Sequence, residues 1–181
     1  AREHGSVCVY LEPIALYHSR DLHPDDGAWL ASYSPAAEAP QLGRTRLHPL
    51  AGQGSRALPA ETLIVTFGNG VPMSLRARDR AAAQDVRADV LDLRWLHPLP
   101  VTDLINQANG RQRIIVADET RHSGGVAESV IAALVDHGFT GSVIRLNSLD
   151  SIIPLGPAAN AVLLDEAQIL AALVNQQENE T

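Results

Sequence analysis

The sequence predicts an α/β protein, a three-layer α/β/α arrangement built on a mostly parallel sheet of about five strands. The main observation is that short apolar runs alternate with longer stretches of helix-forming residues throughout residues 61–175. Strands that alternate with helices form βαβ units, whose helices cover both faces of a parallel sheet. The second observation is composition: of 181 residues, 45% are hydrophobic and 19% charged, which suits a packed core and excludes wholesale disorder.

Strands are expected where aliphatic and β-branched residues form short runs, because these side chains suit a buried, pleated surface. The first run, residues 7–11, is followed by Pro13, whose nitrogen cannot donate to a strand ladder. We expect this run to be a buried strand. Four further strands are predicted at residues 62–67, 88–93, 113–117 and 142–147.

Helices are expected between these strands, where helix-forming residues continue without breakers. The predicted helices cover residues 74–85, 101–108, 125–137 and 165–174. In the third of them Val126, Val130 and Leu134 repeat at helical spacing. In the fourth, Asp165 stands at the N-cap, where a carboxylate can accept a backbone N–H.

The remaining segments are predicted to connect or to fray. Residues 18–60 contain five prolines and no sustained periodicity, so we expect a long connector with one short helix near residues 27–33. Residues 176–181 are polar and are expected to fray. The chain begins without methionine and soon enters an apolar run, which is more typical of a fragment or a processed product.

Charge and cysteine content exclude several classes of protein. Fourteen basic residues, all of them arginine, oppose 21 acidic residues and give a net charge of −7. We therefore expect no nucleic-acid or membrane partner, because both surfaces are anionic, and no apolar run reaches the ~18 residues of a membrane span. The absence of lysine excludes a Schiff-base or Walker lysine, and the single Cys8 excludes an internal disulfide. No secretory signal is visible, so we expect a cytoplasmic protein.

One turn has features of a phosphate site. Gly68-Asn69-Gly70 follows a predicted strand and precedes a helix, where backbone N–H groups can face an anion. A dinucleotide-binding fingerprint would continue with a third glycine, but the chain has Met73 there, and Pro72 removes one donor. We favour a plain strand-to-helix turn, with nucleotide binding as the alternative.

The residues most suggestive of a function follow the strand at 113–117, at the edge where open α/β sheets bind ligands. They are Asp118, Glu119, Arg121, His122 and Ser123, followed by Gly124 and Gly125. His122 beside Ser123 suggests a nucleophile pair, but adjacent residues rarely face each other and no Gly-x-Ser-x-Gly elbow occurs. We favour an interface or a charged loop network over catalysis, and we assign no catalytic residue.

Other titratable residues give weaker signals. His18, Asp21 and His23 lie close together in the connector, but a metal needs three or four convergent ligands, so no metal site is predicted. His97 is expected to pack or to cap before a proline turn. Glu12, at the end of the first predicted strand, is either catalytic or paired with an arginine of a neighbouring domain, and the sequence leaves both open.

Five segments, in chain order, resemble the beta subunits of thiamine-diphosphate-dependent 2-oxo acid dehydrogenases. Residues 11–17 (LEPIALY) are similar to the FLEPKALY strand that closes the pyrimidine-binding domain of those subunits. The other four are similar to successive segments of the transketolase C-terminal domain: residues 63–68 (LIVTFG), 90–99 (VLDLRWLHPL), 115–125 (IVADETRHSGG) and 152–156 (IIPLG). Trp95 and His97 depart from the family pattern, and the connector is longer than usual.

This resemblance implies a domain organisation and a role. Residues 1–17 would hold the last strand of a truncated pyrimidine-binding domain, 18–60 a linker, 61–175 a transketolase C-terminal-like domain and 176–181 a tail. The chain would be the assembly domain of a pyruvate- or branched-chain-type dehydrogenase, which decarboxylates a 2-oxo acid oxidatively and transfers the acyl group to lipoyl. The parent enzyme would use thiamine diphosphate and magnesium.

The resemblance also implies what this chain should lack. The Gly-Asp-Gly…Asn motif and the activating glutamate of the family are not in the matching segments, so we expect the chain alone to bind no cofactor and to be inactive. The expected partners are the remaining domains or the alpha subunit, a second copy of the chain, and a lipoyl acyltransferase. Candidate interface residues are Glu12, Asp118, Glu119, Arg121 and His122. The alternatives are a transketolase- or deoxyxylulose-phosphate-synthase-type enzyme, or a stand-alone interaction module.

Overall fold

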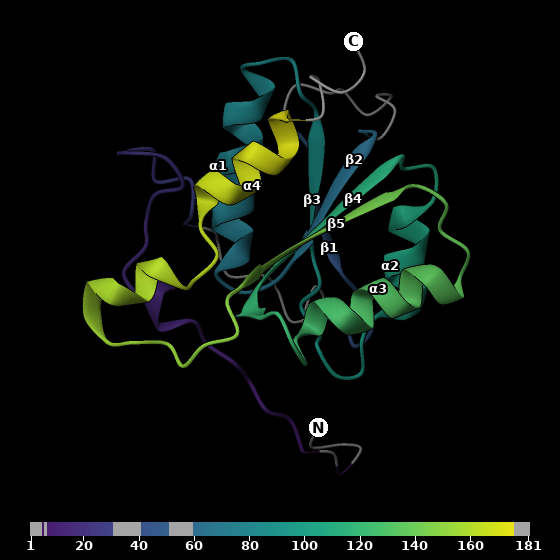
Figure 1. Cartoon of the computed structure of the whole chain (residues 1–181), viewed down its shortest axis with the longest axis horizontal. Helices are drawn as coiled ribbons and strands as arrows, with labels where there is room; N and C mark the ends of the chain where they lie inside the picture. The colour runs from purple at the N-terminus through teal and green to yellow at the C-terminus, as the bar shows by residue number, and fades with distance from the viewer. Residues whose placement is uncertain (1–4, 6, 31–40, 51–59, 176–181) are drawn as a thin grey trace.

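The computed structural model describes residues 5, 7–30, 41–50 and 60–175, and its five strands form one sheet in the order β1-β3-β2-β4-β5 (Figure 1). The strands are β1 (Arg46–His48), β2 (Thr62–Thr66), β3 (Ala88–Asp92), β4 (Arg113–Arg121) and β5 (Ser142–Ser148). Strands β2 to β5 run parallel, and β1 pairs antiparallel with β3 at one edge. The predicted α/β fold with a mostly parallel sheet is confirmed.

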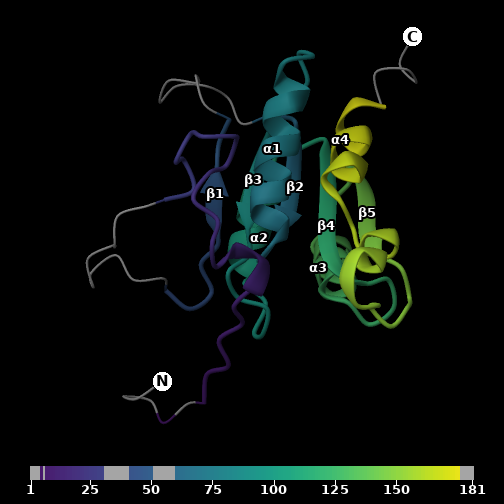
Figure 2. The same ribbon diagram turned by 90° about the vertical axis from the view of Figure 1, so that its left-hand side faces the viewer.

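Helices cover both faces of this sheet, as the three-layer prediction requires. Helices α1 (Gly70–Ala82) and α4 (Glu166–Val174) pack on one face, and α2 (Val101–Ala108) and α3 (Val126–Asp136) pack on the other (Figure 2). The short 3₁₀ helices η1 (Ile14–Leu16) and η3 (Gly156–Ala161), both in described parts of the chain, contain no buried residue.

The core follows from the position of β2 at the centre of the sheet. All five of its residues are buried. Because side chains alternate along a strand, Ile64 belongs to the cluster under α1 and α4, while Leu63 and Val65 belong to the cluster under α2 and α3. A parallel strand covered on both faces therefore reads as a continuous apolar run.

Local signals account well for the helix ends. Asp165 Oδ1 accepts the backbone N–H of Gln168 at 2.8 Å, and Gln168 Oε1 accepts the N–H of Asp165 at 3.0 Å, which forms a capping box. Helix α2 has the predicted bounds. Helix α1 begins at Gly70, four residues earlier than predicted. The helix can include Pro72 because this residue lies in the first turn, where backbone N–H groups make no intrahelical hydrogen bond and a proline therefore loses none.

The predicted connector contains more structure than its sequence indicates. Strand β1 lies within it and pairs Arg46 with Asp92 of β3. The segment 18–30 lies against α1, with Leu22 and Trp29 packed on the core. Residues 27–30 form a turn, and the rest of the predicted helix at 27–33 lies outside the described residues. These contacts join residues that are far apart in the sequence, so no local periodicity could predict them.

The prediction of a buried strand at residues 7–11 is wrong for this structure. Val7 is 94% exposed and Val9 is 83% exposed, and the segment pairs with no strand among the described residues. An apolar run of this kind becomes buried only when a second sheet covers it, and the five-stranded sheet does not reach it. The chain returns to the sheet at Pro13, whose ring lies beside Gly68.

Strand β4 is longer than predicted and carries part of the suspected functional loop. It continues through Arg121, which pairs with Ser148 of β5 after a register shift that follows Asp118. Asp118 to Arg121 therefore lie on a strand, because β5 extends far enough to pair with them.

One described segment, Gly156–Val174, is long and apolar enough to cross a membrane by length and composition alone. It is broken between η3 and α4, where Asp165 stands, and the α4 residues Ile169 and Leu173 are buried in the core cluster that includes α1. Core helices pass the same test, so this is weak evidence for a membrane span.

Candidate functional site

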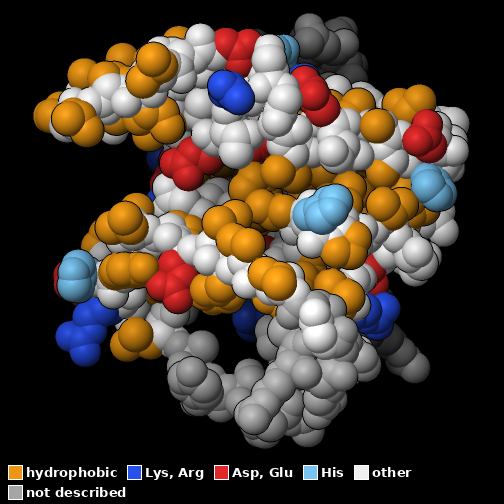
Figure 3. Space-filling view, turned by 90° about the horizontal axis from the view of Figure 1, so that it is seen from below, with side chains coloured by type: hydrophobic (Ala, Val, Ile, Leu, Met, Phe, Trp, Pro, Cys, Tyr) orange, Lys and Arg blue, Asp and Glu red, His pale blue; other side chains and the backbone are white. Residues whose placement is uncertain are grey.

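The suspected site lies at the carboxyl ends of β2, β4 and β5. The chain leaves β2 toward α1 on one face and leaves β4 toward α3 on the other, so β2 and β4 flank the topological switch point of the sheet. Open α/β sheets bind ligands at this position. Figure 3 looks onto this edge from below and shows hydrophobic side chains gathered there, with separate acidic and basic groups around them.

Asp118 is fully buried and holds the start of α3. Its Oδ1 accepts the N–H of Thr120 at 2.8 Å, and its Oδ2 accepts the N–H of Ala127 at 2.7 Å. A carboxylate at this place satisfies an otherwise unpaired helix donor and interacts favourably with the helix dipole. Both of its oxygens are engaged, so Asp118 shapes the edge and does not face a ligand.

Gly125 is needed where the chain turns into α3. A Cβ there would lie 2.5 Å from Thr120 Oγ1, 2.7 Å from the Arg121 carbonyl and 2.9 Å from Asp118 Oδ2. No side chain fits the space at Gly125, whereas Gly124 has open space around it but a φ of 71°, a backbone conformation that favours glycine.

Two further carboxylates accept N–H groups of the turn that precedes α3, whose N-cap is Gly125. Asp150 accepts the Ser123 N–H at 2.8 Å and the Ser123 hydroxyl at 2.5 Å, and Glu128 Oε1 accepts the Gly124 N–H at 3.1 Å. The hydrogen bonds from Ser123 lower the pKa of Asp150. The Ser123 hydroxyl therefore donates to Asp150 and is not paired with His122, which argues against a nucleophile pair. The Ser123, Gly124 and Ala127 N–H groups are therefore already bonded to carboxylates.

The switch point is closed by a polar bridge. Glu119 Oε1 accepts the side-chain N–H of Asn69 at 2.9 Å, which joins the ends of β4 and β2. Gly70 lies so close to the sheet that a Cβ would be 2.0 Å from Thr66 Oγ1, the hydroxyl that donates to the Ala117 carbonyl at 2.8 Å. This geometry favours the plain turn, because a carboxylate beside the α1 N-terminus repels a phosphate.

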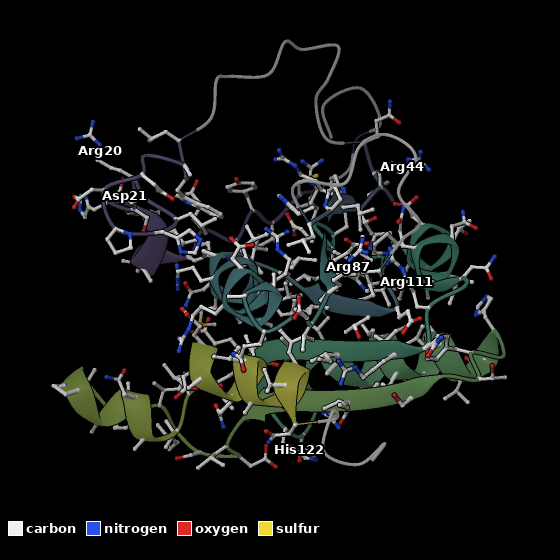
Figure 4. The ribbon with its side chains drawn as sticks, turned by 90° about the horizontal axis from the view of Figure 1, so that it is seen from above. Arg20, Asp21, Arg44, Arg87, Arg111 and His122 are labelled. Carbon is white, nitrogen blue, oxygen red and sulfur yellow. The ribbon has the colours of Figure 1, made fainter. Side chains whose placement is uncertain are left out.

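Arg121 and His122 are exposed, unlike Asp118 and Glu119 on the same strand end. The His122 carbonyl accepts a hydrogen bond from Arg145, whose Nη2 lies 3.5 Å from Glu128 and whose Nε donates to Asn147 at 2.7 Å. The structure thus brings Arg121 and His122 near Asp150, whose pKa both lower. Figure 4 shows His122 at the rim of the sheet, far from the buried Arg111.

The remaining candidates lie elsewhere. Glu12 is exposed, and its Oε2 accepts the Tyr17 hydroxyl at 2.7 Å, which raises the pKa of Tyr17. Asp21 accepts the Gly27 N–H at 2.6 Å, while the His23 ring is bonded to Asp79 at 2.9 Å, so these side chains do not converge with His18. Within the described ranges no three histidine, cysteine or acidic residues are grouped to hold a metal.

The expectation that His97 packs or caps is wrong, since the residue is exposed and no capping hydrogen bond is formed by it in the described chain. Sequence reasoning also missed a buried ion pair beneath the opposite edge. Arg111 Nη1 lies 2.6 Å from Asp89 Oδ2, and the two side chains are 2% and 5% exposed. Asp89 and Arg111 lie 22 positions apart, and no sequence pattern links residues at that separation. Asn69, the partner of Glu119, belongs to the Gly68-Asn69-Gly70 turn that the sequence did single out.

The chain is similar to one protein family and to several curated proteins of known activity. The family profile described as "Transketolase, C-terminal domain" matches residues 56–172. The chain is 29% identical over 110 residues to the pyruvate dehydrogenase E1 component subunit beta of Bacillus subtilis, covering 59% of this chain and 34% of the relative. It is 32% identical over 116 residues to the 1-deoxy-D-xylulose-5-phosphate synthase of Geobacillus thermodenitrificans, covering 64% of this chain and 18% of the relative.

Solved structures agree on the fold. A structure titled "Split gene transketolase, inactive beta4 tetramer" superposes with a TM-score of 0.61 at 20% identity, covering 75% of this chain and 41% of that one. A 2-oxoglutarate:ferredoxin oxidoreductase from Magnetococcus marinus superposes with a TM-score of 0.51 at 15% identity, covering 76% of this chain and 19% of that one. The chain thus spans about a third or less of the two curated relatives' length.

Proposed function

Because the chain belongs to the transketolase C-terminal domain family, we propose that it is the assembly domain of a thiamine-diphosphate-dependent 2-oxo acid dehydrogenase of the pyruvate or branched-chain type. The parent enzyme would decarboxylate a 2-oxo acid oxidatively and pass the acyl group to a lipoyl acceptor. The chain would join the remaining domains or an alpha subunit in the cytoplasm, and a lipoyl acyltransferase would be a further partner.

One observation carries the assembly role: the polar groups at the ligand-binding edge of the sheet are engaged with one another. Asp118 accepts the Ala127 N–H in the first turn of α3, and Glu119 accepts the Asn69 amide. In the turn before α3, Asp150 accepts the Ser123 N–H and Glu128 accepts the Gly124 N–H. An edge built in this way presents a rigid surface and holds no free nucleophile or general base among these residues.

The exposed N-terminal segment supports a neighbouring domain. Residues 7–11 are extended and apolar, with Val7, Val9, Tyr10 and Leu11 between 68% and 94% exposed. Such a segment is suited to add a strand to another sheet, because main-chain hydrogen bonds and apolar pockets can then satisfy it. In the proposal this strand belongs to the pyrimidine-binding domain, and Glu12 and Tyr17 lie at the junction.

The cofactor would be held outside this chain. Thiamine diphosphate and magnesium need an anion clamp and a cluster of oxygen ligands. Three N–H groups in and just before the first turn of α3 are bonded to carboxylates, the Glu119 carboxylate of β4 lies beside the α1 turn, and no metal-binding cluster is formed within the described ranges. In the proposal the cofactor is therefore left to the rest of the enzyme, and we derive no catalytic step from the described residues.

A second candidate is a deoxyxylulose-phosphate synthase or transketolase parent, which the 32% identity to the synthase favours. The LEPIALY segment, residues 11–17, instead favours the dehydrogenase. Both parent enzymes would use the same assembly domain. The two candidates therefore differ in the molecule to which the complete enzyme transfers the group derived from its substrate.

The test is reconstitution. The reading frame upstream of the gene segment is expected to encode Gly-Asp-Gly…Asn, and its product, mixed with this chain, should decarboxylate a 2-oxo acid with reduction of a lipoyl acceptor. The chain alone should show no calorimetric binding of thiamine diphosphate with magnesium. Tight cofactor binding by the chain alone, or condensation of pyruvate with glyceraldehyde 3-phosphate by the mixture, would overturn the dehydrogenase assignment.

A further inference from the structure

Strand β1, at the edge of the sheet beside β3, directs two of its three side chains to the face that carries α1 (Figure 2). Leu47 packs with the cluster under α2 and α3, and side chains alternate along a strand, so Arg46 and His48 face the opposite side. His48 lies opposite Val90 of β3, and Arg46 lies opposite Asp92. Val90 belongs to the core cluster that includes α1, so Asp92, two residues further on, shares that face. Arg46, His48 and Asp92 therefore lie together beneath α1.

Three arginines surround the half-buried ring of His48. Arg78 of α1 donates through Nη1 to the carbonyls of His48 at 3.1 Å and of Pro49 at 3.2 Å. Burial and the charges of Arg46, Arg78 and Arg94 lower the pKa of His48 to about 4. The ring is therefore neutral at pH 7 and lies in a positive field.

This positive charge is balanced only in part. Arg78 Nη2 lies 2.8 Å from Asp79 Oδ1, so these two charges form a pair. Arg94 Nε lies 3.9 Å from Asp92 Oδ2, which is a weaker pairing. Among the residues that the structure describes, no carboxylate lies within ion-pair distance of Arg46. One cationic charge beside His48 is thus left over for an anion from outside the chain.

Two buried polar atoms in the same region have no hydrogen-bond partner. They are His48 Nε2 and Ser74 Oγ, both shielded from solvent and both unbonded within the described chain. Ser74 is fully buried and lies one helical turn before Arg78, on the face of α1 that reaches β1. Folded proteins seldom leave buried polar atoms unpaired, so the two atoms indicate a missing partner.

The chain that follows β3 holds Arg94 in a left-handed conformation. Its φ is 59°, a value that is uncommon for a residue other than glycine. Asp92 Oδ1 accepts the Arg94 N–H at 3.0 Å and fixes this turn. Backbone conformations of this kind collect at sites that bind ligands.

We propose that the space between β1, the end of β3 and α1 binds one phosphate group. Arg46 supplies the uncompensated charge, and its exposed side chain lets the anion enter from solvent. His48 Nε2 and the Ser74 hydroxyl donate the two unpaired hydrogen bonds, and the Arg94 guanidinium completes the set. A phosphate has enough oxygens to accept from four groups, whereas a carboxylate has only two. The source is either free phosphate or the phosphate ester of a metabolite.

The experiment is calorimetric titration of the 181-residue chain at pH 7 and constant ionic strength, with inorganic phosphate in one series and glycerol 3-phosphate in another. At least one of them should bind with a Kd below about 1 mM. Tighter binding of inorganic phosphate assigns the site to the free anion, and tighter binding of the ester assigns it to a metabolite. Arg46→Gln should raise the Kd at least about tenfold, because it removes a charge-assisted donor.

The matched control is Arg87→Gln, which removes an equal charge at an exposed arginine just before β3, at the other end of that strand. It should bind phosphate like the wild type. Ser74→Ala should also weaken binding, and it should not lower the free energy of unfolding because the deleted hydroxyl has no partner. Circular dichroism checks that each variant is folded.

Proton NMR of the His48 ring gives a second readout, with His48→Gln to assign its signal. Bound phosphate stabilises the charged imidazolium, so the pKa of His48 should rise toward its ordinary value of 6.5. Failure of both anions to bind overturns the proposal, as does equal weakening in Arg46→Gln and Arg87→Gln. Binding that leaves the His48 titration unchanged places the anion elsewhere and also overturns it.

The phosphate site goes beyond the proposed assembly role, and the two fail separately. Phosphate binding is measured on the chain alone, so failed reconstitution leaves the phosphate site standing. Absence of phosphate binding leaves the assembly role standing. Magnesium takes up diphosphate oxygens in the thiamine diphosphate complex, so that complex should not compete with phosphate for this site.

Discussion

The carboxylate of Asp89 and the guanidinium of Arg111 meet at 2.6 Å, both almost fully buried, at the end of the sheet opposite the candidate site. The same carboxylate accepts the backbone N–H groups of Leu50 at 3.1 Å and Ala60 at 3.3 Å. One side chain thus fixes the two ends of the segment between β1 and β2, and its charge is balanced by Arg111.

Replacing Arg111 with methionine should therefore destabilise the protein strongly. It leaves an unpaired buried carboxylate, which costs about 3–5 kcal/mol. Urea unfolding measures the loss. The control is Arg44→Met, because Arg44 is 64% exposed and its 3.1 Å contact with Asp103 should contribute at most about 1 kcal/mol. If the two variants lost the same free energy of unfolding, burial of the Asp89–Arg111 pair would not be the reason for its strength.

Asp118 should be a stability residue and not a catalytic one. Asp118→Ala removes the acceptor for the Thr120 and Ala127 N–H groups and should lower the free energy of unfolding by about 1–3 kcal/mol. In the reconstituted enzyme kcat should be unchanged at temperatures where the variant is folded. Asp136→Ala, at the exposed C-terminal end of α3, is the control and should have little effect on stability.

The close approach of α1 to the sheet gives a prediction for a double-mutant cycle. Gly70→Ala places a Cβ 2.0 Å from Thr66 Oγ1 and should cost about 1–3 kcal/mol of stability through overpacking. In a Thr66→Ala background the same change should cost less, because the clashing hydroxyl is gone. Additive losses across the cycle would show that the clash lies elsewhere.

Stability should fall in mildly acidic solution because of His48. Burial, with smaller contributions from Arg46, Arg78 and Arg94, lowers the pKa of His48 from its ordinary 6.5 to about 4. Between these values the unfolded chain binds a proton that the folded chain does not. The free energy of unfolding therefore decreases as the pH falls from 6.5 to about 4 and is independent of His48 above that window.

The size of this effect is about 1–2 kcal/mol, after discounting for the solvent access of a half-buried ring. His48→Gln should flatten this part of the pH profile measured by urea unfolding. His97→Gln, at an exposed histidine, should leave the profile of the wild type. A profile that is identical in wild type and His48→Gln would contradict the assignment.

Much of the fold was predictable because its signals are local. The helix at 101–108 and the cap at Asp165 depend on residues within one or two turns of each other, and the apolar runs of β2 and β3 depend only on burial on both faces. The alternation of these elements was enough to indicate the layered α/β architecture, which the structure confirms.

The identity of the interacting side chains depended instead on distance in space. Asp118 was suspected as an interface residue, yet it meets Ala127, nine positions along the chain, only because β4 and α3 pack together. Glu119 of β4 meets Asn69 because β4 lies beside β2, which Asn69 follows. Asp89 of β3 meets Arg111, just before β4, across the start of β2, which lies between these two strands. The run at 7–11 was read as buried because its composition favours burial, but burial also requires a covering surface. Amino-acid pattern thus determines which segments become strands and helices, since that choice is made by neighbouring residues. Tertiary packing decides which polar groups pair and which apolar surfaces stay open, because pairing and burial are properties of two surfaces in contact.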